Sequence, residues 1–152
     1  MPFSFPISAS SRLARSALVA AALALAACDS VEERIADMFE QAEEQVELGN
    51  YHKALVAYRG ILRLDDDNTD AFLGMARTHE KLGQLNEALA RYLVVADRDK
   101  TSVEAHYKAA QYMLLGGEID RALKLSDTAY DLDPENADVL ATRASVAYKL
   151  GN

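Results

Sequence analysis

Two runs of apolar residues between positions 31 and 62 have the spacing of amphipathic helices. In the first run the apolar residues lie three or four positions apart along one helix face, and they are Val31, Ile35, Met38, Phe39, Ala42 and Val46. The second run follows Gly49 and comprises Tyr51, Leu55, Tyr58, Ile61 and Leu62, before the polar stretch 65–68. This pattern predicts a helix, a turn, a second helix and a second turn. The alternation typical of strands is missing from the sequence.

The same pattern recurs along the chain at intervals of 34 residues. Four glycines mark the interval, and they are Gly49, Gly83, Gly117 and Gly151. An alanine precedes each glycine by seven positions (Ala42, Ala76, Ala110 and Ala144), and another follows the first three by five (Ala54, Ala88 and Ala122). A period of this length is typical of a helix pair that buries its apolar face by stacking on copies of itself. We therefore predict units at residues 35–68, 69–102 and 103–136, and a fourth at 137–152 that contains only its first helix.

Glycine and alanine recur for different physical reasons. A glycine just past a helix end can adopt the left-handed backbone conformation, which a side chain disfavours. An alanine allows two antiparallel helices to cross at close range. Two segments, Ser30-x-x-Glu33 and Thr101-x-x-Glu104, have the form of a capping box and predict that helices begin there.

These features resemble the tetratricopeptide-repeat (TPR) family, in which a small residue, a glycine turn and an Ala-x-x-x-aromatic element recur. The last element stands here as Ala54–Tyr58 and Ala88–Tyr92, while Ser126 takes the aromatic position in the third unit. The closing Asp-Pro of the family occurs once, as Asp133-Pro134. The resemblance covers residues 35–152 and implies an all-α fold, a right-handed superhelical solenoid of antiparallel helix pairs.

Residues 1–27 have the features of a secretory signal peptide. Arg12 and Arg15 precede an apolar run at 17–27, which is about half the ~20 residues that a membrane-spanning helix requires. The run ends in Leu25-Ala26-Ala27-Cys28, which resembles the lipobox of bacterial lipoproteins. This resemblance implies cleavage after Ala27 and acylation of Cys28, with residues 28–34 as a short tether between the lipid and the repeats.

Cys28 is the only cysteine of the chain, so no disulfide partner competes with this interpretation. The alternative is an incidental or buried thiol. Asp29 follows directly and resembles the inner-membrane retention signal of enteric bacteria, which slightly favours the inner over the outer membrane.

The chain is acidic, with a formal net charge of −8. Removal of residues 1–27 takes away Arg12 and Arg15 and no acidic residue, so the mature charge becomes −10. Nucleic acids and anionic lipid headgroups are poor partners for a surface of this charge.

Candidate catalytic and metal-binding residues do not form a pattern. His52, His79 and His106 fall in different helical phases of separate units, and we interpret them as surface or packing residues. The acidic stretch 65–70 lacks the central glycine and distal glutamate of an EF-hand loop, so we interpret it as a helix-capping turn rather than a calcium site. We expect no enzymatic activity, no metal and no cofactor.

The resemblance to TPR proteins also implies a binding groove, lined in that family by the first helix of each repeat. The positions in phase with this groove are Phe39, Leu73, Arg77, Lys81, Tyr107, Lys108 and Gln111. An apolar stripe with basic flanks fits an extended or helical peptide that has apolar anchors and some negative charge. The alternative is that the apolar members pack between repeats.

We therefore expect a lipid-anchored adaptor on the periplasmic face of a Gram-negative cell membrane, binding other envelope proteins or peptides in assembly, secretion or export machinery. Two alternatives remain from the incomplete fourth unit. The chain is a structural scaffold that self-associates through Ala137–Asn152, or it is a fragment of a longer TPR protein.

Overall fold

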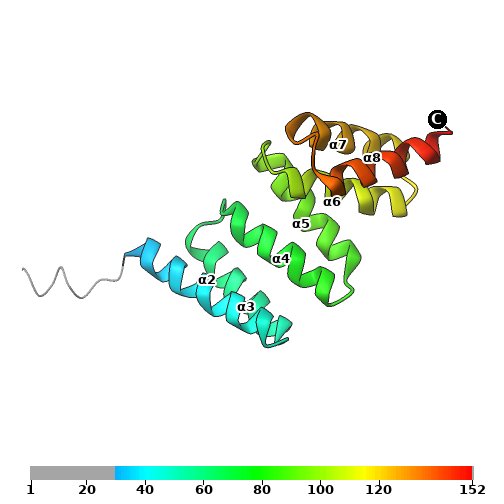
Figure 1. The fold of residues 1–152 in the computed structure, drawn as a ribbon. Coiled ribbons are helices and arrows are strands. Elements are labelled where there is room, and N and C mark those ends of the chain that lie inside the picture. The colour runs from blue at the N-terminus through cyan, green and yellow to red at the C-terminus, as the bar shows by residue number, and fades with distance from the viewer. Residues whose placement is uncertain (1–29, 152) are drawn as a thin grey trace, which may run out of the picture. The chain divides into compact units, whose positions relative to one another are not determined.

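The computed structural model describes residues 30–151, so the predicted signal peptide and Cys28 lie outside the described residues. Within residues 30–151 every regular element is a helix, and the helices are α2 (Val31–Glu47), α3 (Tyr51–Leu64), α4 (Thr69–Lys81), α5 (Leu85–Arg98), α6 (Val103–Leu115), α7 (Ile119–Leu132) and α8 (Ala137–Leu150). Successive helices run antiparallel and are joined by short turns (Figure 1). The predicted all-α fold of helix pairs is confirmed. None of these helices is both long enough and apolar enough to cross a lipid bilayer.

The first described helix begins with the predicted capping box. The backbone N–H of Ser30 donates to Glu33 Oε2 (2.9 Å), and the backbone N–H of Glu33 donates to Ser30 Oγ (3.1 Å). Two amide donors at the helix start are satisfied in this way, so α2 already begins at Val31. Residues 31–34 are therefore helical and do not belong to the tether that was expected over 28–34.

The first helices of the later pairs, α4, α6 and α8, begin with a different cap, which the sequence indicated only at the turn 65–70. Asn68, Ser102 and Asn136 stand 34 residues apart and cap α4, α6 and α8, each accepting a hydrogen bond from a backbone N–H of the first turn. The second predicted capping box was wrong, because the cap of α6 is Ser102 and not Thr101. The Thr101 hydroxyl instead donates to Asp99 Oδ1 (2.7 Å).

Glycine ends the first helix of each pair in the predicted manner. Gly49, Gly83, Gly117 and Gly151 have φ angles of 73°, 71°, 79° and 82°, and they are the residues with positive φ in the described chain. The left-handed conformation at this position is confirmed. It lets the chain reverse direction within the few residues that separate the paired helices.

Alanine pairs form the crossings between the helices of each pair. Ala42 and Ala54, Ala76 and Ala88, and Ala110 and Ala122 are all fully buried. In α8 the corresponding Ala144 is exposed, since no described helix packs on that face. The residues Ile35–Asn152 form one compact unit whose core is a series of clusters between successive helices. This arrangement is the one expected when each repeat packs only on its neighbours.

Candidate peptide-binding groove

Two adjoining pockets of about 320 and 300 Å³ form a groove along α2, α3 and α4. Both are lined by Glu43, Tyr58, Gly74 and Arg77. The first also contains Phe39, Asp70 and Leu73, and the second also contains Val46, Glu47, Thr78 and Lys81. Four of the predicted groove residues, Phe39, Leu73, Arg77 and Lys81, are therefore brought together here.

The floor of the groove is the ring of Tyr58, which lies directly against the backbone of Gly74. A Cβ atom at Gly74 would stand 2.4 Å from Tyr58 Cζ, so only glycine permits this approach. Phe39 meets the same ring edge-on, with the two ring centroids 6.1 Å apart and an interplanar angle of 68°. Phe39 and Leu73 are half-buried, which leaves apolar surface on both walls of the groove.

Burial raises the pKa of the Tyr58 hydroxyl, and the nearby Glu43 carboxylate adds to this effect. Arg77 opposes it in part. The phenol therefore stays protonated and remains a hydrogen-bond donor and acceptor at the groove floor.

Arg77 is already paired within the protein. Its Nε donates to Glu104 Oε1 (2.7 Å) and its Nη2 donates to Glu104 Oε2, a bidentate pair between α4 and α6. Hydrogen bonding to Glu104 is the largest influence on the pKa of Arg77, which lies above its usual value. The guanidinium is therefore bound to the Glu104 carboxylate, whose side chain is only about a quarter exposed.

Lys108, another predicted cation of the groove, is held in a half-buried cluster around Glu80. Its Nζ lies 3.0 Å from Glu80 Oε1, and the Tyr92 hydroxyl donates to Glu80 Oε2 at 2.9 Å. Tyr112 also donates its hydroxyl proton to Glu80 Oε1. The cluster joins α4, α5 and α6, and the rings of Tyr92 and Tyr112 stack with centroids 6.2 Å apart. It has the character of a structural junction between repeats.

Protonation in this cluster follows from its hydrogen bonds. Burial by itself would raise the pKa of Glu80, but the donors Tyr112, Lys108 and Tyr92 outweigh it and hold the pKa below its usual value. Burial and the Glu80 charge raise the pKa of Tyr92 and of Tyr112. Glu80 is therefore ionised and both phenols are neutral at physiological pH.

The pairing of Arg77 and Lys108 changes the expected charge of the groove. The sequence predicts basic flanks that attract a partner with negative charge, but two of the three predicted cations, Arg77 and Lys108, are each paired with a glutamate. Glu43, Glu47 and Asp70 line the same pockets. The groove therefore combines apolar surface from Phe39, Leu73 and Val46 with a rim on which acidic residues outnumber the cations.

The remaining predicted groove residues lie on α6. Tyr107 is half-buried, and burial together with Glu104, Asp138 and Glu80 raises its pKa to about 12. Gln111 does not join the pockets near α2. Its Nε2 donates to Thr142 Oγ1 (2.8 Å) on α8, and it lines a separate pocket of about 330 Å³ with residues of α8.

Histidines and acidic residues have structural roles in the described chain. His79 and His106 are buried, and their Nδ1 atoms form hydrogen bonds with Gln84 Oε1 (2.7 Å) and the Ser102 carbonyl (2.8 Å). Asp65 accepts hydrogen bonds from the backbone of Asp67 and the side chain of Asn68, so the interpretation of this stretch as a capping turn is confirmed. Within residues 30–151, no group of three or more His, Cys, Asp or Glu side chains has a geometry that would hold a metal ion.

Sequence comparison gives one match, to a family model described as Tetratricopeptide repeat, over residues 45–114. This range includes α3, α4, α5 and most of α6. Solved structures extend the likeness to most of the chain, with TM-scores near 0.7. The chain has the TPR fold. No curated protein matches it in sequence.

Three solved TPR structures illustrate the likeness. The type III secretion translocator chaperone SycD of Yersinia enterocolitica is 20% identical, with a TM-score of 0.71, and the match covers 86% of this chain and 94% of SycD. MamA is 22% identical with a TM-score of 0.73, covering 79% of this chain and 66% of MamA. The first TPR domain of Spaghetti, solved with an HSP90 peptide, is 14% identical with a TM-score of 0.71, covering 79% and 95%. At these identities the comparison establishes the fold.

Proposed function

We propose that this TPR chain is a non-enzymatic adaptor that binds a protein segment in the groove along α2, α3 and α4. The observation that carries the proposal is the apolar surface inside the groove, where Phe39 and Leu73 are only half-buried beside the Tyr58 ring. Half-buried aromatic and aliphatic side chains around a rigid floor are the features by which a groove accepts an apolar anchor. Neighbouring folds support it, since SycD was solved with a peptide of the translocator YopD and the Spaghetti domain with a peptide of HSP90.

The groove favours a partner with apolar anchors flanked by neutral or basic residues. Glu43, Glu47 and Asp70 supply negative charge at the rim, and Arg77 is occupied by Glu104. A partner with basic flanks would gain from this rim, while an acidic one would be repelled. Lys81 is the one rim cation for which the described residues show no ion pair.

Membrane attachment is the second part of the proposal. The signal-peptide pattern and the lipobox-like Leu25-Ala26-Ala27-Cys28 support acylation of Cys28 and a place on the periplasmic face of a Gram-negative cell membrane. Because α2 begins at Val31, only a few residues separate Cys28 from the first helix. The groove would then work close to the lipid surface, among the proteins of envelope assembly, secretion or export systems.

Photo-crosslinking in the source cells tests whether the groove binds a partner protein. A benzophenone side chain at Leu73 in the groove should give discrete crosslinked species, while the same group at the exposed Thr128 of α7 should not. A second substitution, Phe39→Asp, should abolish the Leu73 crosslinks without changing the helical circular dichroism. Identical patterns from Leu73 and Thr128 would show that the groove is not the binding surface.

The exposed face of α8 favours a second candidate function, self-association as a structural scaffold. Leu140, Tyr148 and Leu150 are 45%, 79% and 40% exposed on this helix, although each is apolar or aromatic. Sedimentation velocity separates the two functions. A scaffold would form concentration-dependent oligomers that Leu140→Glu with Tyr148→Glu abolishes, whereas an adaptor would remain monomeric with and without these changes.

A further inference from the structure

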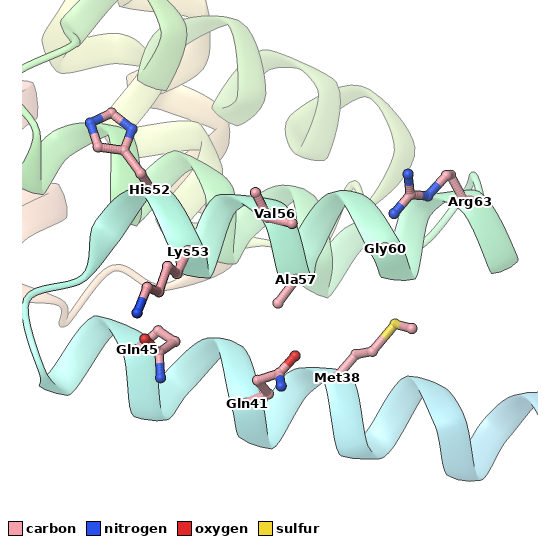
Figure 2. Close-up of a pocket in the computed structure, with 9 residues that line it drawn as sticks. All are labelled: Met38, Gln41, Gln45, His52, Lys53, Val56, Ala57, Gly60 and Arg63. Atoms are coloured by element: carbon pink, nitrogen blue, oxygen red, sulfur yellow. The ribbon is translucent and has the colours of Figure 1, made fainter.

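A further pocket, about twice the volume of either groove pocket, lies between α2 and α3. It has a volume of about 670 Å³ and is lined by Met38, Gln41, Gln45, His52, Lys53, Val56, Ala57, Gly60 and Arg63. Figure 2 shows Met38, Gln41 and Gln45 pointing from α2 toward α3, with Lys53 and Ala57 pointing back toward α2. The pocket shares no residue with the pockets of the groove.

The 34-residue period identifies the residues of the later repeats that correspond to the α2 side of this pocket. Gln41 corresponds to Met75 in the second repeat and to Ala109 in the third, and these two are 3% and 0% exposed. Met75 belongs to the core cluster that contains Tyr58 of α3, and Ala109 belongs to the core cluster that contains Tyr92 of α5. In the second and third repeats the second helix of the preceding pair therefore covers this face of the first helix. On α2 the same face is open, and Gln41 is exposed.

The open pocket therefore has the geometry of a vacant helix position. A helix packed on this face of α2 would contact it in the same way that α3 contacts α4 and α5 contacts α6. Gly60 lines the pocket and allows Met38 to approach α3, since a Cβ at Gly60 would stand 3.1 Å from Met38 Sδ, whereas the equivalent positions in α5 and α7 hold Val94 and Thr128. Val56, 60% exposed at the pocket wall, offers apolar surface to such a helix.

The charge of the pocket selects the kind of helix. In a chain with a net charge of −8, its lining includes His52, Lys53 and Arg63 and no acidic residue. Neither Lys53 nor Arg63 takes part in an ion pair among the described residues. Both cations therefore remain available, unlike the Arg77 and Lys108 pairs of the groove.

We propose that this pocket is a second docking surface, which takes an acidic amphipathic α-helix from another protein as an additional helix ahead of α2. Carboxylates of the incoming helix would face Lys53 and Arg63, and its small apolar side chains would lie on Val56, Ala57 and Gly60. The glutamine amides of α2 would donate to the polar edge of the helix.

Two occupants from this chain itself fit less well. Residues 1–28 contain Arg12 and Arg15 and no acidic residue, so they are positively charged like the pocket and would be repelled by it. The end of a second copy would present α8, which is the first helix of a pair rather than a second one. Helix α8 also contains Arg143 and Lys149 against the single acid Asp138. Neither of them supplies an acidic helix that could take the place of the second helix of a preceding pair.

Two synthetic helical peptides of about 20 residues test the proposal, since shorter isolated helices are marginal in water. Both have the same alanine and leucine face, with glutamates on its flanks in one peptide and lysines in the other. Fluorescence anisotropy with the full 152-residue chain should show the glutamate peptide binding about tenfold or more tightly than the lysine peptide, with the difference shrinking as salt rises. Equal affinities, or no binding of either peptide, would refute the proposal.

Matched variants locate the binding. Lys53→Glu with Arg63→Glu should weaken the glutamate peptide about tenfold or more, while Arg59→Glu with Lys124→Glu makes the same charge change outside the pocket and should leave the affinity nearly unchanged. Gln41→Trp, at an exposed position, should fill the pocket and reduce binding without unfolding the chain. Wild-type affinity in the Lys53/Arg63 variant would contradict the proposal.

Two further results separate this surface from its alternatives. Phe39→Asp, which disrupts the groove, should leave binding of the glutamate peptide intact, so the two surfaces fail independently. Self-association of the wild-type chain that disappears in the Lys53/Arg63 variant would assign the pocket to a second copy and overturn the proposal.

Discussion

Glu80 holds three helices together, and its removal should expose how much of the stability depends on one carboxylate. Glu80→Ala deprives the Tyr92 hydroxyl of its acceptor, and Tyr92 is fully buried. An orphaned buried donor costs about 1–3 kcal/mol. Lys108 can turn to water because a quarter of its side chain is exposed, so loss of its pair adds only about 1 kcal/mol or less. We expect the free energy of unfolding to fall by about 1–4 kcal/mol.

A double-mutant cycle isolates the orphaned hydroxyl. Tyr92→Phe removes the donor together with its need for an acceptor and should cost only about 0.5–1.5 kcal/mol. In the combined Glu80→Ala, Tyr92→Phe chain no buried donor is left without a partner. The cost of the double variant should therefore be smaller than the sum of the single costs, by about 1 kcal/mol or more. Urea unfolding followed by far-ultraviolet circular dichroism measures all four chains. Additive costs, or a Glu80→Ala cost below about 0.5 kcal/mol, would refute this account of the cluster.

Acid should remove the same stabilisation. The pKa of Glu80 is lowered in the folded chain from its ordinary value of 4.5, so its contribution is complete above about pH 4.5 and is lost as the pH falls through the folded value. Glu80→Gln resembles the protonated carboxyl. The difference in unfolding free energy between the wild type and this variant should therefore shrink below about pH 4.5. A difference that stays constant down to strongly acidic pH would show that ionised Glu80 is not the stabilising form.

Three more substitutions test the turns, the groove floor and the anchor. Gly117→Ala places a side chain at a φ of 79° and should cost about 1–2 kcal/mol, whereas Gly116→Ala at a φ of −76° is the matched control and should be neutral or slightly stabilising. Equal effects in thermal melts would contradict the left-handed turn. Gly74→Ala should displace the Tyr58 ring and cost about 1–3 kcal/mol, and an unchanged unfolding free energy would show that the ring is not packed on Gly74. Cys28→Ser should release the protein from the membrane fraction or leave it unprocessed, while an unchanged mature mass and detergent partition would exclude lipidation.

The sequence determined the repeat because local backbone chemistry and helical periodicity recur in it directly. The glycine at each 34-residue step predicts a left-handed turn, and the paired alanines predict helix crossings, without any information on contacts between helices. The first capping box could be read in the same way, because both of its residues lie within one helical turn. The second was misplaced by one residue, since Thr101 and Ser102 are both suitable caps and only the path of the chain decides between them.

Tertiary structure alone decided the charge of the surfaces. Arg77 and Lys108 look free in the sequence, but their partners Glu104 and Glu80 lie 27 and 28 residues away and meet them only when the fold brings α4 and α6 near each other. In the same way, Lys53 and Arg63 on α3 line an open pocket only because none of the helices described within residues 30–151 covers α2 on that side. Local pattern fixes which residues form each helix, but whether a charge is neutralised depends on contacts between repeats, and those have no signature within a single unit.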